Sequence, residues 1–281
     1  MKLSQETLAR LVANFLLTAD DITWNRFSFI NWQDLRPELL TEKHQSAVAF
    51  ITFVEDHLPG YFAEYYRVFP IDEKTSLEDC VHNRELYHFL VRWALEEDRH
   101  SHVLANYQLN CGLTSAEQLG RELATEGRKQ FVTDFSDPCQ IFIYSMLQEK
   151  ATQLYYQQLR SAVREPVLRT LLRLLSRDEA RHFAFFFNVV TAYIEEFGEG
   201  IVPHMRIVLH DFKMPLHDTL TNYWRWALEI SDTAEGYNYT EAFTSLARVI
   251  DKYGNASFRV VATDILQLIG QIRSASLAPR N

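Results

Sequence analysis

The sequence predicts an all-α protein. It has 281 residues, of which 47% are apolar, so the chain can bury a large core. It contains only 9 Gly and 8 Pro, while residues that favour helices are abundant. So few turn-forming residues indicate long helices with few connections, which excludes an all-β fold and a disordered chain.

Helical periodicity divides the chain into a core and a C-terminal extension. Apolar residues recur every three or four positions in the long stretches, and turns precede Pro138 and Pro166. We expect a single domain over residues 1–281, with a core bundle at about 41–197 and a helical extension at 200–281. Helices are predicted at 4–19, 41–67, 77–110, 138–162 and 166–197, with a sixth at 115–131 and shorter ones at 215–231, 237–253 and 256–275.

The charge and the cysteines limit the partners and the compartment. With 37 acidic and 28 basic residues the net charge is −9, which disfavours nucleic acid as a partner. Cys80, Cys111 and Cys139 are odd in number and include no C-x-x-C pair, so we expect neither a disulfide framework nor a thiolate zinc site. The N-terminal apolar run is interrupted by Glu6 and Arg10, and no later stretch is long and apolar enough to cross a membrane. These features predict a cytoplasmic protein.

Two of the long helices carry the same pair of chemically active residues. Glu97 and His100 lie on the apolar stripe of the third long helix, and Glu179 and His182 lie on that of the fifth. Residues three apart face the same side of a helix, so each Glu-x-x-His pair can reach one site. A single pair of this kind is usually a surface feature, but here both copies extend to Glu-x-Arg-His and both are in phase with a buried stripe.

Two further glutamates lie on the apolar stripes of the remaining long helices. They are Glu55 at 41–67, followed by Pro59, which should kink that helix, and Glu149 at 138–162. Buried carboxylates without partners are costly, and metal ions would neutralise them. Mixed carboxylate and imidazole ligands suit iron or manganese, and this set is typical of a ferritin-like four-helix bundle, here with additional flanking helices. The alternative for these six residues is a buried ion-pair network without metal.

Four sequence motifs resemble those of one enzyme family. The segment EEDRH (96–100) is similar to the EENRH motif of soluble acyl-acyl-carrier-protein desaturases, and DEARH (178–182) is similar to their DEKRH motif. QEKAT (148–152) resembles their Q-E-R-A-T helix, and EDHLPGY (55–61) resembles their E-E-A-L-P-T-Y segment. The likeness runs in the same order over residues 30–195, so it is far more specific than any one motif.

The resemblance implies an activity and the residues that carry it. It implies two Fe ions with O2 as co-substrate, an acyl carrier protein thioester as substrate, a ferredoxin-type electron donor and a homodimer. Thr152 matches a threonine on the oxygen-binding side, Asp178 an aspartate that supports a ligand, and Trp32 a tryptophan on the electron-transfer route. By position, the implied iron ligands are Glu55, Glu97, His100, Glu149, Glu179 and His182.

Departures from the family pattern keep other functions open. Ala180 and Phe183 stand where the desaturase motif has Lys and Glu, and residues 200–281 carry no resemblance. A related oxygenase of a small metabolite, either a hydroxylase or an N-oxygenase, is the first alternative. The N-oxygenase branch, which this chain also resembles, has a histidine four residues before the second Glu of the pattern. This chain has Leu175 at that position, which disfavours an N-oxygenase. An alternative of another class is a ferritin-like iron storage protein, which the long C-terminal extension disfavours.

A row of arginines suggests a docking surface. Arg169, Arg173, Arg177 and Arg181 recur every four residues, opposite the ligand side of their helix. Acyl carrier protein is acidic, so this row could receive it; an ordinary solvated helix face is the alternative.

Overall fold

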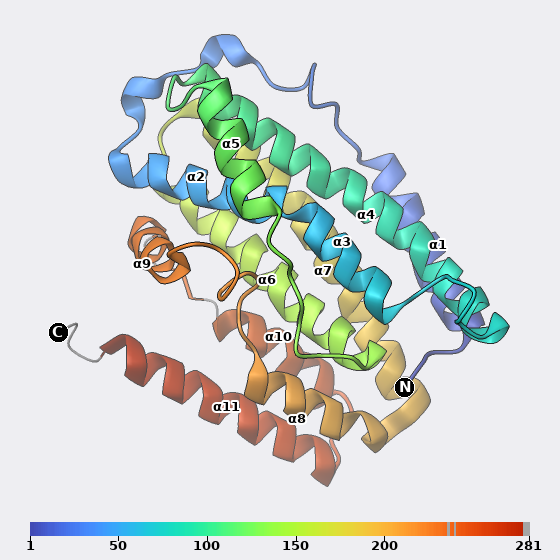
Figure 1. Cartoon of the computed structure of the whole chain (residues 1–281). Coiled ribbons are helices and arrows are strands. Elements are labelled where there is room, and N and C mark those ends of the chain that lie inside the picture. Colours follow the sequence, from blue (N-terminus) through green and yellow to red (C-terminus); the bar gives the residue numbers. More distant parts are fainter. Residues whose placement is uncertain (235–236, 239, 278–281) are drawn as a thin grey trace.

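The structure, a computed structural model, describes residues 1–234, 237–238 and 240–277, and helices dominate it (Figure 1). No strand occurs among these residues, so the all-α prediction is confirmed. The helices are α1 (Gln5–Asp21), α2 (Glu42–Asp56), α3 (Leu58–Val68), α4 (Leu77–Asn110), α5 (Ala116–Gly127), α6 (Pro138–Ala162), α7 (Pro166–Phe197), α8 (Val202–Asp211), α9 (Tyr223–Thr233), α10 (Thr240–Asp251) and α11 (Ala256–Leu277), with short 3-10 turns at Trp32–Asp34, Pro37–Leu39 and Gly198–Ile201.

Local chemistry explains where the long helices begin. Pro138 and Pro166 occupy the first turns of α6 and α7, where a missing N–H costs nothing. Asp137 and Glu165 precede them and cap the free backbone amides of those turns. Glu165 is fully buried and also accepts a hydrogen bond of 2.9 Å from the Tyr107 hydroxyl, which ties the start of α7 to α4.

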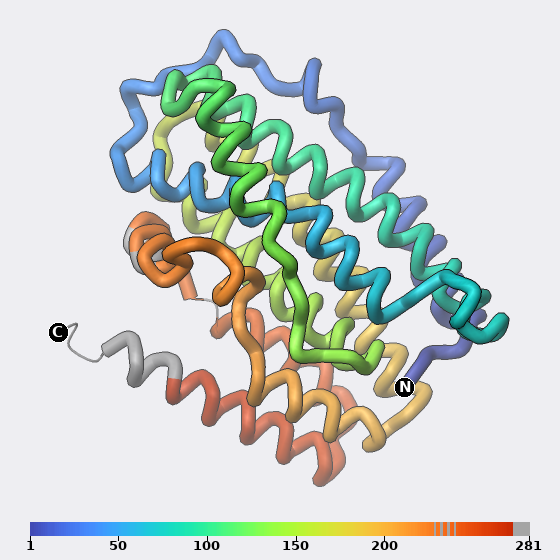
Figure 2. The backbone as a smooth tube through the Cα atoms, in the orientation of Figure 1, coloured from blue at the N-terminus to red at the C-terminus, as the bar shows by residue number. Residues whose placement is uncertain are grey.

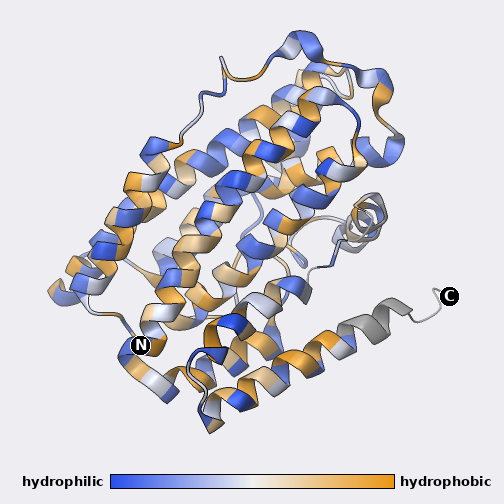
Figure 3. Cartoon of the chain, turned by 180° about the vertical axis from the view of Figure 1, so that it is seen from behind, coloured by the Kyte–Doolittle hydropathy of each residue, from blue (hydrophilic) through white to orange (hydrophobic). Residues whose placement is uncertain are grey.

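Four helices surround the centre of the molecule. α2, α4, α6 and α7 form the bundle, α6 and α7 run side by side along most of their length, and α1 packs on the outer side of α4 and α7 (Figure 1). Hydrophobic and hydrophilic residues alternate along these helices when the molecule is seen from behind (Figure 3). This pattern is that of helices with one buried face, as the sequence periodicity requires.

The helix predicted at 41–67 is interrupted. α2 ends at Asp56 and α3 begins at Leu58, so the expected kink is a complete break between two helices. Pro59 causes it, because its nitrogen cannot donate to the carbonyl of Glu55 four residues earlier. The break places Glu55 in the last turn of α2.

The C-terminal segment differs most from the prediction. Helix α8 was not predicted, and α9 begins at Tyr223 instead of residue 215. α10 packs on α6, and α11 packs on α8 and α10, so these helices lie along one side of the bundle, as the trace shows (Figure 2). Residue 239, within the helix predicted at 237–253, lies outside the described residues.

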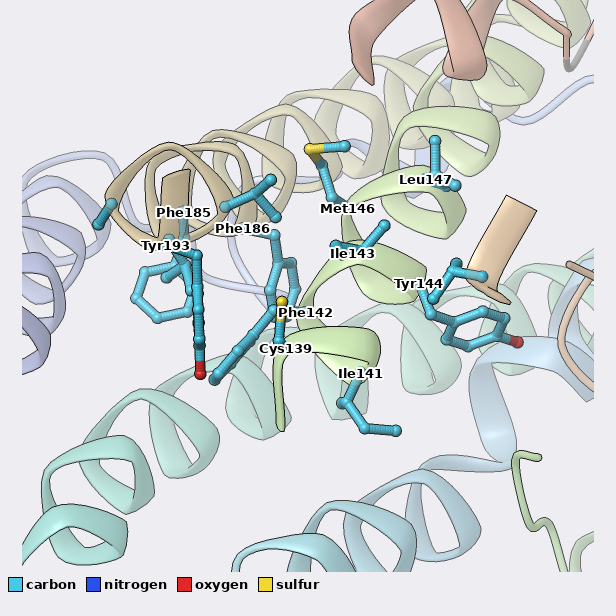
Figure 4. Packing of buried hydrophobic residues seen from close by; sticks show 14 of the residues in the cluster. Cys139, Ile141, Phe142, Ile143, Tyr144, Met146, Leu147, Phe185, Phe186 and Tyr193 are labelled. Atoms are coloured by element: carbon cyan, nitrogen blue, oxygen red, sulfur yellow. The ribbon is translucent and has the colours of Figure 1, made fainter. Parts of the chain in front are cut away.

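Aromatic side chains fill one end of the core. Phe89 of α4 stacks on Phe185 of α7 with ring centroids 3.8 Å apart, and Phe186 meets both edge to face. Phe142 and Tyr193 extend this cluster towards the start of α6 (Figure 4). Such packing holds α4, α6 and α7 in a fixed relation and so fixes the position of the residues between them. Among the described helices, none combines the length and the hydropathy needed to span a bilayer.

Candidate metal centre

The six side chains predicted as ligands come together at the centre of the bundle. All six are at most 7% exposed, although four helices contribute them. α2 and α6 each supply one glutamate, while α4 and α7 each supply a glutamate and a histidine three residues later: Glu55, Glu149, Glu97 with His100, and Glu179 with His182.

The six residues form two groups that share members. One comprises Glu55, Glu97, His100 and Glu179, and the other comprises Glu97, Glu149, Glu179 and His182; within each group the candidate ligand atoms lie within 4.8 Å of one another. Glu97 and Glu179 therefore offer an oxygen to both groups. Nδ1 of His100 is 3.4 Å from Oε1 of Glu179, and Nδ1 of His182 is 3.0 Å from Oε1 of Glu97.

Buried polar atoms without partners show that metal ions fit this site. Nδ1 of His100 and of His182, Oε2 of Glu149 and Oε1 of Glu179 are buried and have no hydrogen-bond partner. Orphaned buried nitrogen and oxygen atoms are costly, and a cation would satisfy all four. Four ionised glutamates carry a charge of −4, which two divalent cations would balance.

Without cations, protons must neutralise the cluster. Burial raises the pKa of Glu55 to about 8, and the charge of Glu97 beside it adds to the shift. Burial alone would lower the pKa of the two imidazoles. Hydrogen bonds to the surrounding carboxylates nevertheless hold the pKa of His100 and of His182 well above its usual value. Divalent cations would take the place of these protons, as they do when carboxylates and imidazoles bind metals.

A second layer of charged residues surrounds the two histidines. Asp178 Oδ2 lies 3.3 Å from Nε2 of His100, a position from which it can support that candidate ligand. Arg181 bonds Oδ1 of Asp178 at 3.0 Å, and Arg99 lies 3.6 Å from Oδ2. With Nε2 donating to Asp178, Nδ1 of His100 faces the glutamates and would be free to bind a cation once that cation replaces its proton.

Glu96, which was not among the residues predicted from the sequence, supports His182 as Asp178 supports His100. Its Oε2 lies 2.9 Å from Nε2 of His182 and 2.5 Å from Arg181. A signal was present, because Glu96 precedes Glu97 as Asp178 precedes Glu179 in the two copies of the acid-Glu-x-Arg-His pattern. The two negative charges of Glu96 and Asp178 are balanced by the two positive charges of the buried Arg99 and Arg181.

The tryptophan beside this layer is Trp24. Its Nε1 donates a hydrogen bond of 2.7 Å to Asp178, and Arg99 lies over its ring at 4.7 Å. Trp32, the residue given this place by the family resemblance, lies in the 3-10 turn Trp32–Asp34 and is only partly buried. No contact found among the described residues joins it to Asp178 or His100, and the place of Trp32 on the electron-transfer route stays a prediction.

A cavity reaches the cluster from the side of α3 and α6. Glu55, Glu97 and Glu179 of the cluster line it, and so does Thr152 of α6. Its free volume is about 50 Å³, so the cavity is narrow but has room for more than one water molecule. Thr152 thus lines the same cavity as three of the candidate ligands, and its role stays a prediction.

The arginine row does not form an open surface. Arg181 is buried between Glu96 and Asp178, and Arg177 bonds the carbonyl of Ile22. Arg169 bonds the carbonyls that end α6, so only Arg173 is freely exposed. The expected docking row is therefore wrong: its residues mostly fix the N-terminal segment, the end of α6 and the histidine supports.

Comparisons with known proteins place this geometry in a family. DesA1 of Mycobacterium tuberculosis, named as an acyl-[acyl-carrier-protein] desaturase, is 24% identical over 216 residues, and DesA2 of the same organism, with the same named activity, is 23% identical over 172 residues. These matches cover 68% and 59% of this chain, which spans about 60% of the length of DesA1 and 57% of that of DesA2.

A solved structure has the same fold. The X-ray structure of DesA2 superposes with a TM-score of 0.65 at 14% identity, covering 92% of this chain and 98% of that one. The prediction of a ferritin-like helical bundle with flanking helices is thereby confirmed. The model of the fatty acid desaturase family matches residues 22–266, and the chain therefore belongs to that family.

Proposed function

We propose that the protein is an O2-dependent di-iron oxidase that introduces a double bond into an acyl chain carried as a thioester on acyl carrier protein. One observation carries the proposal: two groups of buried ligands that share Glu97 and Glu179 lie at the inner end of a cavity. The family and the named activity of the relatives support the acyl substrate.

Each residue of the centre has a separate task in this proposal. Glu55 and His100 would help hold one ion and Glu149 and His182 the other, while Glu97 and Glu179, which belong to both groups, could contribute to holding either ion. Two ferrous ions there would supply electrons to O2 and so the oxidant that takes hydrogen from an unactivated C–H bond.

The proposed reaction balances only with an external reductant. The substrate loses two hydrogen atoms from neighbouring carbons, and a donor supplies two electrons and two protons. O2 receives all of these and leaves as two molecules of water. We propose a ferredoxin-type protein as this donor.

The route for these electrons is proposed to run through Trp24. Trp24, Asp178 and His100 form a continuous hydrogen-bonded series from a side chain near the N-terminal segment to a ligand. Asp178 has a second task, since it fixes the ring orientation of His100.

We propose that two copies associate through the outer face of α4. Val91 and Leu95 are 49% and 51% exposed and, with Val81 and Tyr87, form an apolar stripe along this helix; these four residues are called the α4 stripe below. Such a run of exposed apolar side chains is typical of a protein interface. The cytoplasm is the proposed compartment, in keeping with three unpaired cysteines.

Incubation of the reduced, iron-loaded protein with a panel of acyl carrier protein thioesters and O2 tests the function. Mass analysis should find a product lighter by two hydrogens. A product that has gained one oxygen atom would identify an oxygenase instead. Iron uptake into a multi-subunit cage without oxidation of any acyl chain would identify a storage protein.

A further inference from the structure

The cavity beside the metal centre has a mostly apolar lining that also carries several polar side chains. One face of α6 lines it from Ile141 to Thr152, which are eleven steps and hence about 16 Å apart along the helix. Tyr61, Glu64 and Tyr65 of α3 line the opposite wall, and Trp93 of α4 lies near the inner end.

Some of the polar side chains that line the cavity already have hydrogen-bond partners. The Tyr65 hydroxyl and Ser145 Oγ are 2.6 Å apart. Glu64 accepts hydrogen bonds from Arg67 and from both the amide and the hydroxyl of Thr133. These groups need no ligand.

Two hydrogen-bond donors in the wall have no partner. Trp93 is 4% exposed, and its Nε1 is buried without an acceptor. The Tyr61 hydroxyl is likewise buried and unpaired. Trp93 packs edge to face against Tyr65 at 5.5 Å and lies 6.5 Å from the ring of His182, so this donor is close to the reacting end of the cavity.

We propose that this cavity selects a chain bearing an oxygen acceptor, which Tyr61 and Trp93 bind, over an unsubstituted alkyl chain. A plain alkyl chain would displace water from both donors and would accept no hydrogen bond from either, which weakens its binding. A carbonyl oxygen would restore the hydrogen bonds and fix the chain along the cavity. The inference rests on the proposed function, because it specifies the substrate of the same site.

Dipentyl ketone and undecane are matched probes for this preference. They have the same chain length and differ by one carbonyl. Their binding to the iron-loaded, O2-free protein is measured by partition from the headspace. In Tyr61→Phe the ketone should bind roughly fivefold to tenfold more weakly while undecane binds as before or more tightly. Trp93→Phe should also reduce the preference for the ketone.

Tyr155→Phe is the matched control. Tyr155 also has a buried hydroxyl without a partner, but it does not line the cavity. This control should leave both affinities unchanged. The proposal would be overturned if Tyr61→Phe lost equal affinity for the ketone and the hydrocarbon, or lost affinity for neither. Failure of both probes to bind the parent protein would also overturn it.

Acyl carrier protein thioesters then distinguish two sources of the oxygen. A preference for a long chain with an oxo group in its middle would assign the acceptor to a substituent. A preference for a short unsubstituted chain would assign it to the thioester carbonyl. If long unsubstituted chains bind more tightly than both the oxo-substituted chains and the short chains, the inference is overturned and the desaturase proposal is left intact. Absence of any O2-dependent oxidation by the iron-loaded protein would instead overturn the proposed function, while the ketone measurement, which is made without O2, would stand.

Discussion

Glu96 Oε2 lies 2.9 Å from Nε2 of His182, although the two residues belong to different helices. Asp178 has the same relation to His100, at 3.3 Å. Each Glu-x-Arg-His segment thus supplies the acid that supports the histidine of the other segment. This reciprocal exchange makes the positions of α4 and α7 depend on each other and leaves both Nδ1 atoms facing the glutamates.

Iron content should distinguish a shared ligand from an unshared one. Glu179 belongs to both ligand groups and Glu149 to only one. We expect Glu179→Ala to lose nearly all iron, and Glu149→Ala to keep about half of the parent's iron. Both variants should stop consuming O2, because the paired site is incomplete.

The control for this measurement is Glu122→Ala, since Glu122 is exposed on α5 and distant in sequence from every candidate ligand. It should keep the parent's iron and O2 consumption, measured by metal analysis and an oxygen electrode. Parent levels of both in Glu149→Ala and Glu179→Ala would contradict the site.

The tryptophan pair provides a test of electron transfer. Trp24→Phe removes the hydrogen bond to Asp178, so reduction of the ferric protein by a ferredoxin-type donor should slow about 10- to 100-fold with unchanged iron content. Trp32→Phe is the matched control and should reduce at the parent's rate. Stopped-flow absorbance follows both reactions. Slow reduction in Trp32→Phe, with Trp24→Phe unaffected, would reverse the assignment.

Most of the bundle could be predicted because its helices are long and strongly periodic. The bounds of α4, α6 and α7 agree with the sequence prediction, since each has an apolar stripe and a clear start or stop signal. Helix α8 has only ten residues and three buried apolar ones, which is too short for periodicity to identify. The break at His57 was anticipated only as a kink, because a proline pattern does not reveal how far a helix bends.

The grouping of the candidate ligands could be predicted and the position of Trp24 could not, for a physical reason. Glu97 and His100 are fixed relative to each other by helical spacing, which a sequence displays directly. Trp24 reaches Asp178 from an irregular segment 154 positions away, and its path depends on how residues 22–41 cross the bundle. Arg181 shows the same limit, since its spacing places it on an outer ridge while the structure buries it against Glu96 of α4.

Thr152 should affect the coupling of the reaction and leave metal binding intact. It lines the cavity beside Glu55 and Glu179 but belongs to neither ligand group. Thr152→Val keeps the shape and removes the hydroxyl, so we expect unchanged iron and less product for each electron consumed. Thr170→Val is the control, since that hydroxyl bonds the carbonyl of Pro166 within α7. Equal product yield per electron in Thr152→Val and the parent would reduce Thr152 to a packing residue.

The α4 stripe should determine the oligomeric state. In a dimer Val91 and Leu95 would be buried, so placing charge on both in Val91→Glu with Leu95→Glu should bury two carboxylates in an apolar interface and shift the protein to monomers. The matched control is Leu266→Glu, because Leu266 is 70% exposed on α11 and lies outside the stripe. Native mass spectrometry and sedimentation should show dimers for the parent and the control, and monomers for the double variant at the same concentration.

Iron content should match the parent in all three, since the ligands lie on the opposite side of α4. A parent protein that is monomeric, or a double variant that remains dimeric, would remove α4 as the interface.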